Sequence, residues 1–153
     1  MSDYLVDLYK LNDEQFPEIN GVRFVRVLSP NSDMVVKFVE ENFSKFWASE
    51  VKASLYKNNP SCFIAVRGTQ IVGFAAYDAT CKGFFGPTGV LQSERGNGIG
   101  SVLLRLCLKA MKEEGYAYAV IGSSSDRAVK FYQRNCNAIE IPDSSRVYSR
   151  LIK

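Results

Sequence analysis

The sequence predicts a single α/β (α+β) domain built around a mixed β-sheet. Three observations support this fold class. The chain has 153 residues, the usual length of one domain. Strand-like and helix-like hydrophobic patterns alternate along it, and at least one strand-helix-strand crossover is present. A chain of this size buries roughly 69% of its unfolded surface, so its core needs no disulfide or metal for support.

The expected strands are short runs of β-branched, aromatic and small apolar residues, bounded by glycine, proline or asparagine. A short Gly68-Thr69 turn separates two of these runs and predicts an antiparallel hairpin. Glycine and proline interrupt the run at 82–91, which predicts a bulge, a sheet edge or a close approach of a ligand. The strands are expected at 4–10, 22–28, 62–67, 70–77, 82–91, 116–121, 138–141 and 146–152.

Four helices are expected from apolar residues at helical spacing. The first begins near Asn31 and Ser32, and the second covers 44–57. The third has the strongest apolar stripe and runs from Ile99 to a terminal glycine, Gly115. The fourth is capped by Ser124 or Ser125 and ends at Cys136.

The most informative segment joins the interrupted strand to the third helix and contains three glycines. A helix N-terminus presents unpaired N–H donors and the positive end of the helix dipole, so it favours anions. Glycines there allow the backbone to approach a phosphate closely, and Arg95 adds a positive charge. The spacing matches neither the dinucleotide fingerprint, because Ser101 replaces the third glycine, nor the P-loop.

The run Val90-x-Gln92-x-x-Arg95-Gly96-x-Gly98-Ile99-Gly100-x-x-Leu103-Leu104 resembles the acyl-CoA-binding signature of the GNAT superfamily of N-acetyltransferases. A second run, Ala128-Val129-Lys130-Phe131-Tyr132, resembles the A-x-x-F-Y segment of the same family. The chain departs from the pattern at Gln92, often proline, at Ser125, commonly asparagine, and at Asn137-Ala138, often Gly-Phe.

The resemblance implies a single GNAT-like domain over 1–153, with a mixed central sheet flanked by helices on both faces. It covers the chain from about Val22 onward and leaves 1–20 as an extra N-terminal segment. The implied cosubstrate is acetyl-CoA, with its pyrophosphate at the glycine loop. The implied cofactor-binding residues are Val90, Leu91, Arg95, Gly96, Asn97, Gly98, Ile99, Gly100, Ser125, Ala128 and Tyr132.

The implied reaction is direct attack of a primary amine on the thioester carbonyl through a tetrahedral intermediate. The resemblance implies that Tyr132 acts as the general acid for the CoA thiolate, and the similar basicity of the two groups agrees with this role. Backbone N–H groups near Val90 and Leu91, with Leu91 assigned the contact, are expected to stabilise the oxyanion.

The general base stays open among Glu50, Asp78, Glu94 and an ordered water. A route through an acyl-cysteine at Cys81 or Cys136 is disfavoured, since the chain has no histidine to activate a thiol. The acceptor amine, a small molecule or a protein, is also open. Four aromatic residues near the first two helices form either core or an apolar acceptor pocket: Phe43, Phe46, Trp47 and Tyr56.

The amino-acid composition limits which reaction mechanisms and which ligands are possible. Without histidine, Ser-His and Cys-His mechanisms are excluded, and we expect no metal. Four cysteines with no C-x-x-C spacing are expected to be free thiols. A net charge of +3 is too small to indicate nucleic-acid binding.

No apolar run is long enough to span a membrane, and Asp3 and Asp7 stand where a signal peptide needs positive charge. We therefore expect a cytoplasmic protein with no membrane partner. Its oligomeric state is open, with a homodimer among the candidates. The alternative to an acetyltransferase is a non-catalytic acyl-CoA-binding module, because the glycine loop is complete while no base is evident.

Overall fold

The computed structural model describes residues 1–12, 15–122 and 124–153. In this part of the chain, seven strands form one sheet in the order β2-β3-β4-β5-β6-β1-β7. The strands are β1 (Asp3–Asp7), β2 (Val22–Arg26), β3 (Cys62–Arg67), β4 (Gln70–Tyr77), β5 (Phe84–Val90), β6 (Tyr118–Ile121) and β7 (Ile139–Ile141). The helices are α1 (Ser32–Asn42), α2 (Lys45–Leu55), α3 (Ile99–Glu113) and α4 (Asp126–Cys136).

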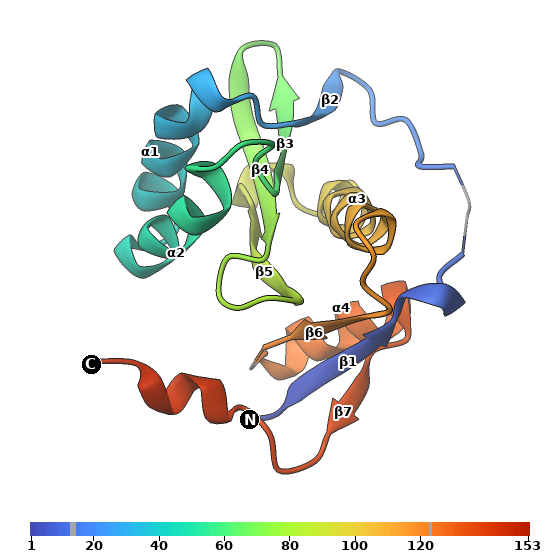
Figure 1. Cartoon of the computed structure of the whole chain (residues 1–153). Coiled ribbons are helices and arrows are strands. Elements are labelled where there is room, and N and C mark those ends of the chain that lie inside the picture. The colour runs from blue at the N-terminus through green and yellow to red at the C-terminus, as the bar shows by residue number, and fades with distance from the viewer. Residues whose placement is uncertain (13–14, 123) are drawn as a thin grey trace.

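Helices cover both faces of the sheet, as expected. In Figure 1, α1 and α2 lie on one side of β3, β4 and β5, and α3 lies on the other. The core is correspondingly divided. One apolar cluster joins α1 and α2 to one face, with Val35, Val51 and Phe74 fully buried. The other joins α3 and α4 to the opposite face, around Leu103 and Met111.

The predicted hairpin and helix ends are confirmed. β3 and β4 are paired antiparallel across the Gly68-Thr69 turn. Ser125 caps α4, because its side chain accepts a hydrogen bond from the N–H of Ala128. Gly115 follows α3 with a φ of 105°, a conformation that favours glycine and stops the helix.

Two terminal predictions are corrected by the structure. The expected closing strand at 146–152 is instead a 3₁₀ helix, η4 (Arg146–Arg150). Asp143 and Ser145 have positive φ values of 52° and 71°, so they turn the chain away from the sheet before it can pair. The N-terminal strand ends at Asp7, whose side chain accepts from the N–H of Tyr9 and caps a short 3₁₀ turn, η1 (Leu8–Lys10).

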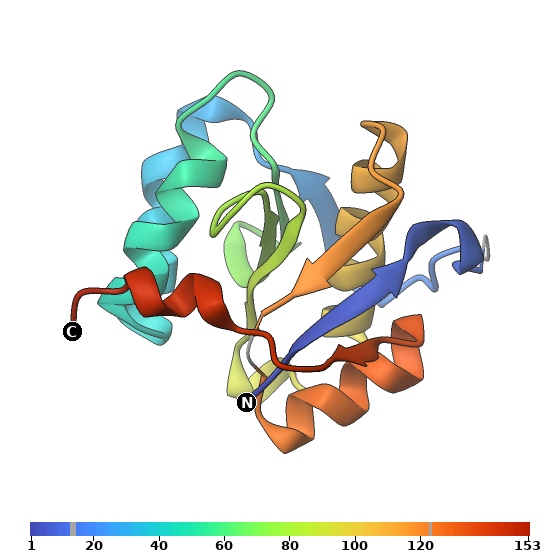
Figure 2. The same ribbon diagram turned by 60° about the horizontal axis from the view of Figure 1, so that its bottom comes forward.

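The N-terminal strand lies inside the sheet. β1 is antiparallel to β6 on one side and to β7 on the other. Val6 is fully buried, and Asp3 is 6% exposed. Figure 2 shows β1 between the orange β6 strand and the red C-terminal region. The first residues of the chain therefore help to hold its last residues in place.

Candidate active site

β5 and β6 run parallel and, in the described part of the chain, share only two paired positions, Phe84 with Val120 and Phe85 with Ile121. The register between β4 and β5 shifts next to these pairs, as the glycine and proline in this run predicted. β6 ends at Ile121, whereas β5 continues to Val90. Among the described residues, the edge of β5 beyond Phe85 that faces away from β4 therefore has no strand partner.

The backbone of β5 presents donors on this open edge. The Leu91 N–H donates to the Val72 carbonyl oxygen at 2.9 Å, so this donor is already used within the sheet. Hydrogen-bonding direction alternates along an antiparallel strand, which turns the N–H groups of Val90 and Thr88 to the opposite edge. The oxyanion contact expected from Leu91 is therefore corrected, because its N–H points toward β4.

The glycine segment forms a tight turn into α3. Gly96 and Gly98 have φ values of 85° and 86°, which L side chains rarely adopt. Gly98 is the N-cap of α3 and provides no side-chain cap. The first helical hydrogen bond joins the Val102 N–H to the Gly98 carbonyl oxygen at 3.2 Å. The N–H groups before Val102 at the start of α3 therefore have no partner within the helix, an arrangement that favours anions.

Side chains fix the position of this loop. Arg67 forms two hydrogen bonds with the Glu94 carboxylate, at 2.8 and 2.9 Å, and ties the loop to β3. The Arg95 Nε donates to the Val90 carbonyl oxygen at 3.2 Å, which confirms that this carbonyl faces away from β4. Asn97 donates to the Glu94 carbonyl oxygen at 3.3 Å. Arg95 is exposed beside the start of α3, where its charge can meet an anion.

The fold brings the two signature segments together. An added Cβ at Gly100 would contact Val90 at 3.6 Å and Phe131 at 3.7 Å. The Ser101 hydroxyl also forms a hydrogen bond with Asn135, one turn beyond Phe131. The start of α3, the end of β5 and α4 therefore meet at one place, although the segments are far apart in the sequence.

Tyr132 projects from α4 into the core beside β5. Its ring packs edge-on against Phe85 at 6.1 Å and Phe131 at 5.3 Å between centroids, and the side chain is 7% exposed. Its hydroxyl makes no hydrogen bond with the described residues. Burial raises the pKa of Tyr132, so the phenol stays protonated at physiological pH. The Tyr132 ring thus lies against Phe85, at the point where β5 leaves β6.

The three carboxylates considered as general base have different environments. Glu94 is paired with Arg67, whose hydrogen bond lowers its pKa, so it is a poor base and serves to fix the loop. Asp78 accepts from the Tyr116 hydroxyl at 2.8 Å and from the Gly83 N–H at 2.7 Å, which ties it into the β4–β5 loop. Neither carboxylate is free for the reaction.

Glu50 differs from the other two. It lies on α2, partly buried, and accepts a hydrogen bond from the Thr80 hydroxyl at 3.0 Å. Burial raises the pKa of Glu50, and the Thr80 hydrogen bond offsets part of that effect. A carboxylate with a raised pKa is better matched to accept a proton near neutral pH.

The cysteines are free thiols, as predicted. Cys136 is buried on α4 and its thiol donates to the Tyr132 carbonyl oxygen at 3.2 Å. Burial raises the pKa of Cys136 to about 12, which keeps it protonated and removes it as a nucleophile. Cys81 is partly buried in the β4–β5 loop.

The four aromatic residues that were expected to form either core or an acceptor pocket lie in different environments. Phe43 covers β5, because a Cβ at Gly89 would lie 2.5 Å from its ring. It packs against Phe74 and stacks on Trp47, at centroid distances of 5.4 and 5.6 Å. Phe46 is 71% exposed and Tyr56 is 56% exposed. Phe43 and Trp47 therefore border the site from the helical side, whereas Phe46 and Tyr56 are outside the core.

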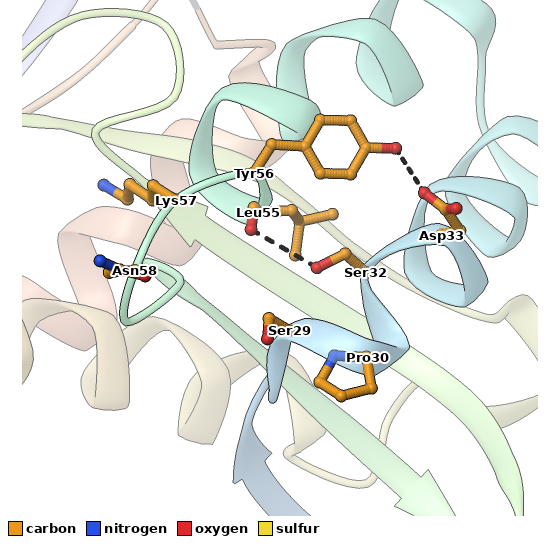
Figure 3. A pocket seen from close by; sticks show the side chains of 8 residues that line it. All are labelled: Ser29, Pro30, Ser32, Asp33, Leu55, Tyr56, Lys57 and Asn58. Atoms are coloured by element: carbon orange, nitrogen blue, oxygen red, sulfur yellow. Dashed lines mark hydrogen bonds between the residues drawn. The ribbon is translucent and has the colours of Figure 1, made fainter.

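A shallow hollow of about 450 Å³ lies elsewhere, where α1 begins and α2 ends. Figure 3 shows its lining, in which the Tyr56 hydroxyl donates to Asp33 at 2.6 Å and the Ser32 hydroxyl faces the Leu55 carbonyl oxygen. It contains none of the residues of the glycine turn. The hollow is therefore separate from the place where the start of α3, the end of β5 and α4 meet.

Within the described residues, no group of three or more cysteines and carboxylates is placed to hold a metal ion. None of the helices in the same residues is both long and apolar enough to cross a bilayer.

Tyr148 lies next to the end of β6, and the sequence analysis did not identify it. It lies on η4, and its hydroxyl rests against Gly122, the residue that follows β6. The segment around it was expected to be a strand, and no local pattern signals its position. Only the path of the chain after β7 brings this tyrosine to the end of β6.

Known proteins resemble this chain in both sequence pattern and fold. A model of the acetyltransferase (GNAT) family matches residues 6–138. No curated protein matches the sequence.

Among solved structures, a GCN5-related N-acetyltransferase from Sphaerobacter thermophilus is similar, with a TM-score of 0.70 and 22% identity over 92% of this chain and 48% of that chain. A GCN5-related glucosamine N-acetyltransferase region of a fungal multi-domain protein has a TM-score of 0.71 and 16% identity, covering 92% of this chain and 19% of that chain. An aminoglycoside acetyltransferase from an uncultured soil metagenomic sample has a TM-score of 0.57 and 18% identity, covering 77% of this chain and 90% of that chain. The chain thus spans about half or less of the first two, and at these identities the likeness concerns the fold.

Proposed function

The chain belongs to the acetyltransferase (GNAT) family, and we propose that it is an enzyme that transfers the acetyl group of acetyl-CoA to a primary amine. One observation carries the proposal. The glycine turn at the start of α3 and the unpaired edge of β5 lie side by side, because a Cβ added at Gly100 would lie 3.6 Å from Val90 and 3.7 Å from Phe131 on α4. An anion site next to a row of free backbone groups suits a ligand with a diphosphate and a polar extended arm.

The residues present fit acetyl-CoA. The N–H groups from Gly98 to Ser101 and the guanidinium of Arg95 would hold the diphosphate. The open edge of β5 would accept the amide groups of the pantetheine arm as an added strand does. The ligand supplies an acetyl thioester, a good acyl donor to an amine.

The chain would contribute three functions to the reaction. Val90, with Thr88 beside it, offers backbone N–H groups to the developing oxyanion, in place of Leu91. Tyr132 gives its proton to the departing thiolate, since its hydroxyl is protonated and makes no competing hydrogen bond among the described residues. Glu50 takes the proton lost by the amine, directly or through a water.

The acceptor is proposed as a class. Similar structures include proteins described as acting on glucosamine and on aminoglycosides, both of which carry primary amines. These two compound types therefore belong in the first substrate panel, together with a polyamine, free amino acids and a lysine-containing peptide. A protein acceptor would be represented by the peptide.

The test is release of free CoA thiol from acetyl-CoA, followed with a thiol-reactive dye while each amine of the panel is added in turn. We expect thiol release that depends on both amine and enzyme, with the acetylated amine identified by mass spectrometry. The matched control is Tyr132→Phe, which keeps the ring and its packing but removes the donated proton. Saturable binding of acetyl-CoA with no turnover of any amine would instead support an acyl-CoA-binding module.

A further inference from the structure

The segment after β7 reaches back to the end of β6, next to the site described above. In Figure 1 the red C-terminal helical turn η4 lies below α2, and in Figure 2 it lies beside the part of the helical pair where α2 begins. The hydroxyl of Tyr148 on this turn rests directly on Gly122. A Cβ at Gly122 would overlap that hydroxyl oxygen and lie 2.8 Å from Tyr148 Cζ. The tyrosine therefore sits where β6 ends and the partner edge of β5 becomes free.

Asp3 holds this segment in place. Its carboxylate accepts hydrogen bonds from the N–H and the hydroxyl of Ser145, both at 3.0 Å. Its own N–H donates to the Ser144 hydroxyl at 2.8 Å, and that hydroxyl donates to the Ile141 carbonyl oxygen. We call this set of contacts between Asp3, Ser144 and Ser145 the Asp3 clamp. It immediately precedes η4, so it sets the direction in which Tyr148 projects.

Burial raises the pKa of Tyr148 to about 12, and the charges of groups on three other elements add to this effect. They are Asp3 on β1, Glu50 on α2 and Cys81 in the β4–β5 loop. On η4 itself, Arg146 is paired with Asp143 at 2.9 Å, and Arg150 is exposed. The phenol is therefore a neutral hydrogen-bonding group, and the charges of two carboxylates, Asp3 and Glu50, act on it.

These surroundings suit one class of acceptor. An alkylamine arrives in water as a cation with three N–H donors, and a carboxylate and a phenol oxygen can each accept one of them. An amine that carries its own carboxylate, such as a free α-amino acid, would meet repulsion from Glu50. Because acetyl-CoA would bind along the open edge of β5, an amine held beside that edge would have its nitrogen near the acetyl group.

We propose that Tyr148, set in position by the Asp3 clamp, binds the acceptor amine together with Glu50 and selects cationic amines that lack a neighbouring carboxylate. The inference rests on the proposed acetyltransferase function and adds the acceptor end of that site. Asp3 acts through the segment it holds and is a positioning residue.

The acceptor ammonium loses two protons during the reaction. Glu50 takes one proton from the bound ammonium, which leaves the neutral amine that attacks the acetyl carbon. The C–N bond to the acetyl carbon forms before the C–S bond breaks, and the departing thiolate takes the proton of Tyr132. The second proton of the nitrogen leaves to solvent, from which Tyr132 regains its own. Tyr148 keeps its proton throughout and supplies orientation only.

The first experiment compares the wild type with Tyr148→Phe on spermidine, an aminoglycoside, glucosamine, glycine and glutamate. We expect acetylation of the cationic amines in preference to the two amino acids. Tyr148→Phe should raise KM for the accepted amine about tenfold, the usual cost of one lost hydrogen bond to a charged group. It should leave the Kd for acetyl-CoA unchanged. Tyr118→Phe is the matched control, because Tyr118 is 54% exposed on β6 and should behave as wild type.

The second experiment tests the Asp3 clamp. Asp3→Ala should raise KM for the amine and speed tryptic cleavage after Arg146 and Arg150, while acetyl-CoA binding stays the same. The control is Ser2→Ala, which removes only the exposed hydrogen bond to Glu140 at 2.6 Å. Equal cleavage of Asp3→Ala and wild type would overturn the positioning role of Asp3.

The outcomes separate the two proposals. If amines are acetylated but Tyr148→Phe has the wild-type KM, the inference fails and the proposed function stands. If Tyr148→Phe weakens acetyl-CoA instead of the amine, the tyrosine belongs to the donor side and the inference is overturned. Preference for glycine or glutamate over the cationic amines would overturn the selection. If no amine is acetylated by the wild type, the proposed function fails and the inference is withdrawn with it.

Discussion

Gly89 on β5 tests how closely the helical layer covers the site. A Cβ at this position would lie 2.5, 2.6 and 3.1 Å from three atoms of the Phe43 ring, well inside van der Waals contact. The ring has little room to move, because Phe38, Phe74 and Trp47 pack around it at centroid distances of 5.4 to 5.9 Å. Gly89→Ala must therefore displace either Phe43 or the strand.

Overpacking of this kind costs about 1–3 kcal/mol in the free energy of unfolding. We expect Gly89→Ala to lose about 2 kcal/mol, which corresponds to a fall in Tm of about 4–8 °C for a domain of this length. Urea denaturation followed by tryptophan fluorescence measures the change. Trp47 is the only tryptophan of the chain and stacks on Phe43, so it reports directly on the displaced ring.

A double-mutant cycle with Phe43→Leu isolates the cause. Leucine lacks the ring atoms that a Cβ at Gly89 would meet, so Gly89→Ala should cost less than about 0.5 kcal/mol in that background. An equal penalty in both backgrounds would show that the strand conformation, and not the contact with Phe43, requires glycine. Unchanged stability of Gly89→Ala alone would refute the packing described here.

Three further predictions concern the site itself. Arg95→Glu should weaken acetyl-CoA binding at least about tenfold by calorimetry, whereas Arg23→Glu, an exposed change on β2, should not. Tyr132→Phe should lower kcat about 100-fold and leave the free energy of unfolding within about 0.5 kcal/mol, and an unchanged kcat would remove Tyr132 from the mechanism. Burial raises the pKa of Glu50 above its ordinary value of 4.5, and a general base must be ionised to accept a proton. We therefore expect kcat/KM to fall as the pH drops through this raised pKa. Glu50→Gln should abolish this fall in a pH–rate profile.

Local patterns predicted most of the fold. The hydrophobic stripe that begins at Ile99 and the glycine at position 115 predicted α3. The Gly68-Thr69 turn predicted the β3–β4 hairpin. Sequence also indicated the bulge in β5, since glycine and proline disturb regular pairing. These features depend on residues close to one another in the chain.

The sequence could not show what depends on distant contacts. The 146–152 run has the alternation of a strand, but positive φ values at Asp143 and Ser145 turn it away from the sheet. The choice among the three carboxylates also needed the structure, because only the partners of Glu94 and Asp78 show that these two are engaged. The direction of the Leu91 N–H could not be predicted either. It depends on the register between β5 and β4, which decides which N–H groups face the open edge of β5.

Calorimetric titration with acetyl-CoA, with free CoA and NADH as comparison ligands, tests the central claim most directly. The account predicts saturable binding of acetyl-CoA and CoA with a stoichiometry near one, because both carry the diphosphate and pantetheine arm that the α3 terminus and the β5 edge suit. It predicts no saturable binding of NADH, whose diphosphate lacks that arm. Absence of binding by both CoA species, or equal binding of NADH, would contradict the assignment of the glycine turn and the open strand edge as an acyl-CoA site.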